Sequence, residues 1–180
     1  MKITYNAPVI LTFSILCTVI FVMDRYLYLN VMPYFLVGNH ISWTNPFSVA
    51  TIVTHVLGHA SMEHLLGNLT FILLLGPIVE EKYGSSRLTI MIIATALITG
   101  VLNLIFFNTG LMGASGIVFM LIILASFTNN KGGGIPLTFI LVAILFLGKE
   151  VMQSLQADQV SQFAHIIGGL CGSFFGFAKR

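Results

Sequence analysis

Residues 111–127 read LMGASGIVFMLIILASF, in which a serine between two glycines is followed directly by a long apolar run. A transmembrane helix gains nothing from that serine, and a glycine inside a helix costs about 1 kcal/mol relative to alanine. Either the glycines admit a close neighbour, or another group must reach the serine. Both interpretations require partners elsewhere in the chain.

The composition of the chain is that of a membrane protein. Of its 180 residues, 57% are hydrophobic and 8% are charged, and the mean hydropathy is +0.97. A soluble domain carries about 25% charged residues, so this chain has too few charges to cover a water-facing surface. The two cysteines, Cys17 and Cys171, lie in apolar segments and do not indicate a disulfide framework.

Six segments are apolar enough to span a bilayer, which takes about 20 residues per helix. We therefore predict a single all-α transmembrane domain over residues 1–180, with no separate soluble domain. The first apolar run lacks a small-x-small cleavage site and is expected to be a retained helix. The predicted spans are residues 8–23, 61–79, 88–107, 115–127, 136–152 and 163–177.

The basic residues support an even number of spans. In a six-span topology only Arg25 and Lys149 lie on the side opposite the N-terminus, and six basic residues lie on the side of the N-terminus. Positive charge gathers on the cytoplasmic side of membrane proteins, so both termini are predicted to be cytoplasmic. The six residues are Lys2, Lys82, Arg87, Lys131, Lys179 and Arg180.

The connection between the first two spans, residues 25–60, is long, aromatic and interrupted by proline. Tyrosine and tryptophan favour the level of the lipid head groups. We predict an interfacial, partly embedded segment, and a plain surface loop is the alternative. Its aromatic residues are Tyr26, Tyr28, Tyr34, Phe35, Trp43 and Phe47.

Polar side chains are rare in the predicted spans, and polar groups at membrane depth are costly and usually functional. His64 and Asn68 lie four residues apart and therefore share one face of the second span. His165 lies near the start of the sixth span and is followed by Gly168 and Gly172. This small-xxx-small pattern lets another helix approach closely, so the imidazole is predicted to lie on a packing surface.

The fourth span is the predicted partner of that surface, because Gly113 and Gly116 flank Ser115. Close packing would bring the Ser115 hydroxyl within hydrogen-bonding reach of the His165 imidazole. Serine needs such a base to act as a nucleophile. Neither span contains Asp or Glu, so the sequence predicts a dyad and not a triad.

Further groups would complete such a site. Phe119, one turn after Ser115, could stack on the imidazole. The Ser115 backbone N–H at a helix start, with the His64 and Asn68 side chains, would donate hydrogen bonds to an oxyanion. Each residue alone has a simpler interpretation as a packing or helix-bonding group, and only the combination indicates catalysis.

The combination resembles the rhomboid intramembrane serine proteases, most closely the bacterial GlpG type. The shared motifs are His64-x-x-x-Asn68, GASG at residues 113–116, and AHxxGxxxG at residues 164–172. The resemblance implies a six-helix bundle in the bacterial inner membrane, with the active site open to the periplasmic side. It also implies cleavage of transmembrane protein substrates by a serine endopeptidase without cofactor or metal. The lipid bilayer is then an expected partner and nucleic acid is not, and the pattern predicts no particular oligomeric state.

The resemblance also implies the roles of individual residues. Ser115 would be the nucleophile and His165 the general base, and the Ser115 N–H, His64 and Asn68 would form the oxyanion hole. Phe119 occupies the position of an aromatic residue that packs on the catalytic histidine. Gly113, Gly116 and Gly168 belong to the matching motifs.

Other positions extend or break the resemblance. His59 matches a histidine near the active-site water pocket, and Glu80 matches a glutamate that we expect to brace the first loop. The chain departs from the family at Ala50 and Thr51, where a Trp-Arg pair is frequent. This departure leaves open how the first loop is anchored.

Two other classes of function compete with a protease. His55 and His59, with His64 nearby, could ligate a metal or haem, and six spans could form a small transporter or scaffold.

If the chain is a protease, the loop at residues 153–162 is the predicted lid. Substrate would then pass between the second and fifth helices.

Overall fold

The computed structural model describes residues 3–38, 40–128, 134–147 and 159–178. These residues are largely helical, and the extended pairing within them is one antiparallel bridge between Val37 and Leu111. The elements are α1 (Pro8–Arg25), η1 (Met32–Phe35), α2 (Pro46–Thr54), η2 (His55–Leu57), α3 (Met62–Tyr83), α4 (Ser85–Phe106), α5 (Ser115–Phe127), α6 (Leu137–Val142), η3 (Ala143–Leu147) and α8 (Gln159–Ala178).

The helix starts follow local sequence signals. Pro8 occupies the first turn of α1, where its missing N–H costs nothing. The Ser61 hydroxyl caps α3 by accepting a hydrogen bond from the His64 N–H at 3.1 Å. The Asn45 side chain caps α2 in the same way through the Phe47 N–H.

Each predicted span coincides with a helix. Three of these helices, α1, α3 and α4, are long and apolar enough to cross a membrane, whereas α5 and α8 are shorter apolar helices. The fifth span contains α6 and the π-helical turn η3, and its predicted end lies outside the described residues. The fold is thus a bundle of apolar helices, and the count of six spans stays a prediction.

The helix ends differ from the predicted ones at the junction of α3 and α4. The predicted second span ends at residue 79, but α3 continues to Tyr83, and α4 begins at Ser85. Pro77 lies inside α3 without ending it. An apolar run marks only the hydrocarbon crossing of a helix, so polar turns at either end are missed.

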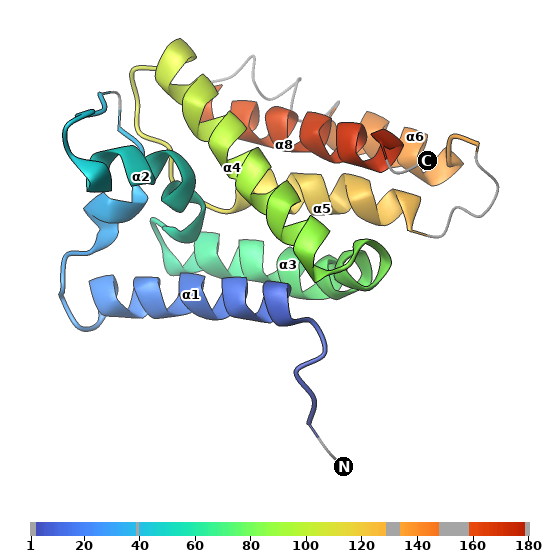
Figure 1. Ribbon diagram of the computed structural model, residues 1–180, viewed down its shortest axis with the longest axis horizontal. Coiled ribbons are helices and arrows are strands. Elements are labelled where there is room, and N and C mark those ends of the chain that lie inside the picture. The colour runs from blue at the N-terminus through green and yellow to red at the C-terminus, as the bar shows by residue number, and fades with distance from the viewer. Residues whose placement is uncertain (1–2, 39, 129–133, 148–158, 179–180) are drawn as a thin grey trace.

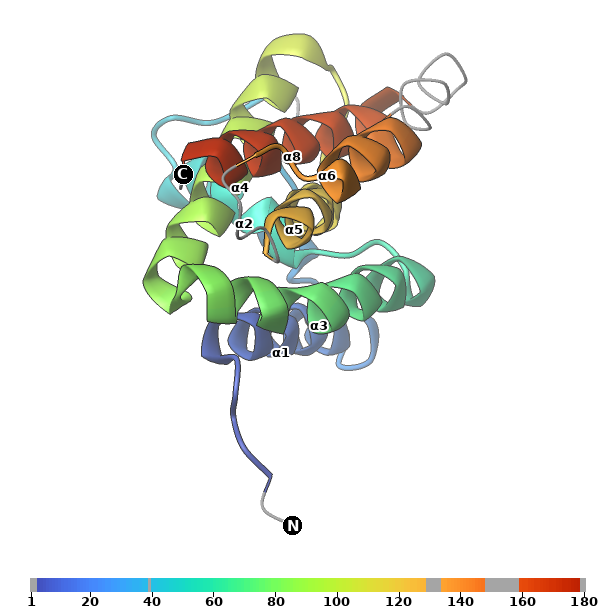
Figure 2. The same cartoon turned by 90° about the vertical axis from the view of Figure 1, so that its right-hand side faces the viewer.

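The centre of the bundle is α5, in which ten of thirteen residues are buried. Figure 2 shows α5 almost end-on, with α8 on one side and α3 on the other. In Figure 1, α5 and α8 run alongside each other, while α1 lies against α3 and α4 crosses the bundle. The helix that begins at Ser115 is therefore enclosed by the other helices.

The expected role of Glu80 was wrong. Its carboxylate accepts hydrogen bonds from the backbone N–H groups of Val9 and Ile10 at 3.0 and 3.1 Å, and from the Ser85 hydroxyl at 2.7 Å. It therefore caps α1 and joins it to α4. The first loop enters α3 at the opposite end, about 27 Å from Glu80 at 1.5 Å rise per residue, beyond the reach of a side chain.

Candidate active site

Ser115 is the first residue of α5, and the backbone leading into it accounts for Gly113. Gly113 has φ of +130°, which side-chain-bearing residues rarely adopt. A Cβ at this position would also lie 2.5 Å from Cε1 of His64. The glycine thus permits a sharp turn and lets the His64 ring lie directly against the segment that presents Ser115.

The second glycine of the motif, Gly116, forms the contact between α5 and α8. A Cβ on Gly168 would overlap the Gly116 carbonyl group, and a Cβ on Gly116 would meet the Ala164 carbonyl oxygen at 3.3 Å. The close helix approach predicted from the glycines is therefore present. It brings the residue after Ala164, His165, to the α5 surface that begins at Ser115.

The His165 ring lies on the ring of Phe119. The ring centroids are 4.3 Å apart and the planes differ by 8°, which is a stacked arrangement. Phe119 is 9% exposed, so its orientation is fixed by the surrounding core. Because Phe119 follows Ser115 by one helical turn, the stacked imidazole is held on the side of α5 that carries Ser115.

His59, His64 and Asn68 form a second polar group next to this pair. The Asn68 amide donates to Nε2 of His59 at 3.0 Å, and Nδ1–H of His59 donates to the Leu57 carbonyl at 3.3 Å. The rings of His59 and His64 pack edge to face with centroids 5.1 Å apart. His64 is also close enough to His165 to interact electrostatically. The structure thus gathers the polar residues that the motifs predicted.

His59 lies in the loop before α3 and is neutral at physiological pH. Burial and, to a smaller extent, the neighbouring His64 lower its pKa from the ordinary 6.5 to about 4, against a smaller opposing effect of the bond to Leu57. Neutral Nε2 is a hydrogen-bond acceptor, so His59 can hold the Asn68 amide. Protonation would replace that acceptor with a donor and break the bond.

We expect the protein to lose stability in mild acid. The depressed pKa of His59 favours the folded state fully above pH 6.5, and this contribution is lost as the pH falls towards 4. The midpoint of thermal unfolding should therefore fall between pH 7 and pH 4.5, and the fall should be smaller for His59→Gln. An unfolding midpoint that is constant over this range in the wild-type protein would contradict the expectation.

His55 is buried but belongs to a different network. Its Nδ1–H donates to the Ile52 carbonyl at 3.1 Å, and Nε2 lies 3.3 Å from the Thr99 hydroxyl of α4. Its own carbonyl accepts the Gly113 N–H at 2.9 Å. His55 therefore ties the first loop to α4 and to the turn before Ser115.

Among the described residues no group of three potential ligands could hold a metal ion, and the metal-site alternative is not favoured.

The first loop is anchored by residues that the sequence reasoning missed. The Asp24 carboxylate accepts the Met32 N–H at 2.9 Å, and Nη2 of Arg25 donates to the Ala60 carbonyl at 2.7 Å. Val37 and Leu111 exchange two backbone hydrogen bonds of 3.1 and 2.9 Å. The first loop thus has anchors other than the positions of Ala50 and Thr51. The charged pair directly after the first apolar run was the available signal.

The Rhomboid domain family model matches residues 46–180 of this chain. The chain belongs to the rhomboid family. The matched region contains every candidate catalytic and oxyanion residue. The rhomboid lid predicted at residues 153–162 lies largely outside the described residues.

Individual rhomboids are similar to parts of the chain. Rhomboid protease GlpG of Haemophilus influenzae is 24% identical over 128 residues, which cover 69% of this chain and 67% of that protein. Rhomboid protease GlpG of Salmonella choleraesuis is 35% identical over 75 residues, and that of Salmonella newport equally so. Each Salmonella match covers 42% of this chain and 27% of the relative.

Proposed function

We propose that this rhomboid is an intramembrane serine endopeptidase that hydrolyses peptide bonds in or near the transmembrane segments of membrane proteins. The observation that carries the proposal is the approach of α8 to α5 at Gly116 and Gly168, with the His165 ring stacked beside the start of α5. The geometry supports Ser115 as nucleophile and His165 as general base.

In the proposed reaction, Ser115 Oγ attacks the carbonyl carbon of the scissile bond while His165 takes the hydroxyl proton. The tetrahedral intermediate carries its negative charge on the former carbonyl oxygen. His165 then gives the proton to the leaving amine, and an acyl-enzyme remains on Ser115. Water, activated by the same imidazole, hydrolyses the ester and restores the serine.

The oxyanion would be stabilised by donors from two elements. The first N–H groups of a helix have no partner within it, and the helix dipole is positive there, so the Ser115 N–H is available at the start of α5. An amide –NH₂ carries two hydrogens. The bond from Asn68 to His59 uses one, and the other can donate to the oxyanion. The His64 ring against Gly113 is the third candidate donor.

We expect Asn68→Ala and His64→Ala each to leave reduced but measurable activity. Removing one oxyanion donor typically lowers kcat by about 10²–10³, and the Ser115 N–H remains in both variants. The rate of cleavage of a single-span substrate measures the loss. If neither variant is slower than wild type, these side chains serve helix packing and not catalysis.

A fluorophosphonate probe tests the proposed function directly. The probe reacts with an activated serine, so we expect covalent labelling of Ser115 in the folded protein and none in the heat-unfolded protein. A transporter, scaffold or metal protein has no activated serine. Absence of labelling in a protein shown to be folded would overturn the proposal.

We also propose the membrane in which the protein lies and the side to which its active site opens. The excess of basic residues on the side of the N-terminus supports two cytoplasmic termini, and the similarity to bacterial rhomboids supports a location in the bacterial inner membrane. The active site would then open to the periplasmic side. Irregular backbone such as residues 107–114 is tolerated at membrane depth where it is buried or lines water, which hydrolysis requires.

Substrate is proposed to enter between α3 and α6. A Cβ added at Gly67, next to Asn68, meets no atom within 4 Å, so space exists beside α3 near the candidate site. We expect a bismaleimide tether between Gly67→Cys and Leu145→Cys to lower cleavage of a transmembrane substrate. The same double variant without the tether is the control. Full activity with the tether confirmed by mass spectrometry would rule out this route.

A further inference from the structure

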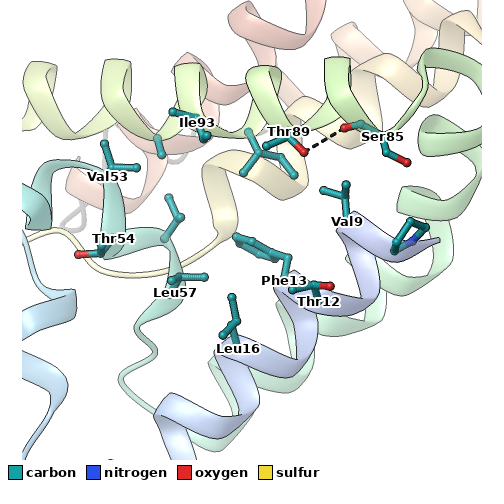
Figure 3. Close-up of a pocket in the computed structure, with 14 residues that line it drawn as sticks. Val9, Thr12, Phe13, Leu16, Val53, Thr54, Leu57, Ser85, Thr89 and Ile93 are labelled. Atoms are coloured by element: carbon teal, nitrogen blue, oxygen red, sulfur yellow. Dashed lines mark hydrogen bonds between the residues drawn. The ribbon is translucent and has the colours of Figure 1, made fainter. Parts of the chain in front are cut away.

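A cavity of about 490 Å³ lies between α1, the α2–η2 segment and α4 (Figure 3). Its volume is within the range of ligand pockets, roughly 300–1,000 Å³. None of its lining residues is a candidate catalytic or oxyanion residue. Its occupant therefore differs from the substrate proposed above, and the cavity needs its own explanation.

The position of the cavity restricts the source of the occupant. Its rim contains Leu16 of α1 and Ile93 of α4, which are 44% and 49% exposed. Both helices are long and apolar enough to span a membrane, so exposed apolar side chains on them face hydrocarbon. The cavity is thus accessible from the bilayer, and lipid is the molecule available there.

The chemistry of the lining selects hydrocarbon over a polar ligand. Most of the lining consists of aliphatic side chains with Phe13, and its four hydroxyl groups already have hydrogen-bond partners. An occupant would therefore meet carbon and bonded hydroxyls. The bonded pairs are Thr12 with the Tyr5 hydroxyl at 3.0 Å, Thr54 with the Tyr34 carbonyl at 2.8 Å, Thr89 with the Ser85 carbonyl at 2.9 Å (Figure 3), and Ser85 with Glu80 at 2.7 Å.

One end of the cavity has a polar continuation. Pro8 and Ser85 also line a neighbouring cavity of about 440 Å³, which contains Asn6, Glu80 and Glu81. Among the described residues that line it, two are carboxylates and none is basic. Glu80 is bonded to backbone N–H groups, whereas Glu81 is exposed. A negative, partly exposed site at a helix end favours a positively charged head group.

We propose that the cavity binds one acyl chain of a phospholipid with an ammonium head group, and that the head group lies beside Glu81. Val56 and Leu57 line the cavity, and His55 in the same turn accepts the Gly113 N–H through its carbonyl. The bound chain thus supports the turn that holds the segment before Ser115. The site is separate from the one where substrate is cleaved.

The test uses phosphatidylethanolamine with a diazirine in one acyl chain, in nanodiscs of equal phosphatidylethanolamine and phosphatidylglycerol content. We expect photolabelling to concentrate on the peptides around Thr12–Leu16 and Ile92–Ala96. Ile93→Trp fills the opening and should reduce this labelling to the level of the surrounding helix surface. Ile90→Trp makes the same change on the same helix, at a 64% exposed position outside the cavity, and should leave it unchanged.

Equal labelling of Ile93→Trp and Ile90→Trp, or labelling spread evenly over all helices, would overturn the site. Leu16→Trp closes the cavity from α1 and replaces Ile93→Trp if that variant does not fold.

The head group is tested with the matching phosphatidylglycerol probe. We expect weaker labelling by this probe in the wild type and in Glu63→Gln, and loss of the difference in Glu81→Gln. Equal labelling of the wild type by the two lipids would overturn the head-group assignment.

Discussion

Replacing Ser115 by alanine is expected to abolish cleavage of a single-span substrate while leaving a folded, extractable protein. His165→Ala should have the same effect, because the serine is a poor nucleophile without a base. In serine proteases the loss of one such residue lowers kcat by about 10⁶. Cleavage in proteoliposomes, followed by gel electrophoresis of the substrate, measures the loss.

The double variant decides whether the two residues act as one unit. Catalytic groups that act together are not additive, so Ser115→Ala combined with His165→Ala should be no slower than either single variant. The thermal unfolding midpoint of each variant serves as the folding control. A double variant far below both singles would mean that the two residues contribute independently, and would contradict the dyad.

Replacing Gly168 by alanine is expected to remove most activity and to destabilise the protein. The added methyl group would overlap the Gly116 carbonyl, so α8 must move away from α5. Inserting atoms into a packed interface costs about 1–3 kcal/mol, and a displacement of about 1 Å at a catalytic group can lower the rate about 100-fold. Activity and the unfolding midpoint are measured on the same preparation.

Gly67→Ala is the matched control for this change. It introduces the same methyl group in a helix, but at an exposed position where no atom lies within 4 Å. Alanine is favoured over glycine by about 1 kcal/mol inside a helix, so this variant should be at least as stable as wild type. If the unfolding midpoint of Gly168→Ala is equal to that of Gly67→Ala, the close contact between α5 and α8 does not govern the stability of the bundle.

The helices could be predicted from the sequence because an apolar run, a capping residue and a loop signal are local. The start of α5 at Ser115 agrees with the predicted span, since a turn-forming glycine directly precedes a continuous apolar run. Ser61 as the cap of α3 is local in the same sense. The close approach of α5 and α8 could be inferred because only glycine spacing permits it.

The anchoring of the first loop could not be predicted in this way. The bridge between Val37 and Leu111 joins residues far apart in sequence through backbone groups, which leave no residue pattern. The bond between Asn68 and His59 crosses from a helix to a loop, and no helical spacing indicates it. Glu80 was assigned to the wrong partner because its position in a motif says nothing about which helix ends beside it.

Backbone hydrogen bonds join the first loop to the segment before Ser115, and they limit how the sequence of this loop can change in evolution. Peptide N–H and carbonyl groups form the bonds from Val37 to Leu111 and from His55 to Gly113, and nearly every amino acid carries them. Exposed side chains of this loop, such as Ala50, can therefore be replaced more readily than His55 and His59, whose side chains are buried and bonded to α4 and α3. A change of length between Gly38 and Thr54 is different, because it would shift one bonded point relative to the other. Substitutions at exposed positions should be tolerated there, whereas single-residue insertions and deletions should be eliminated by selection.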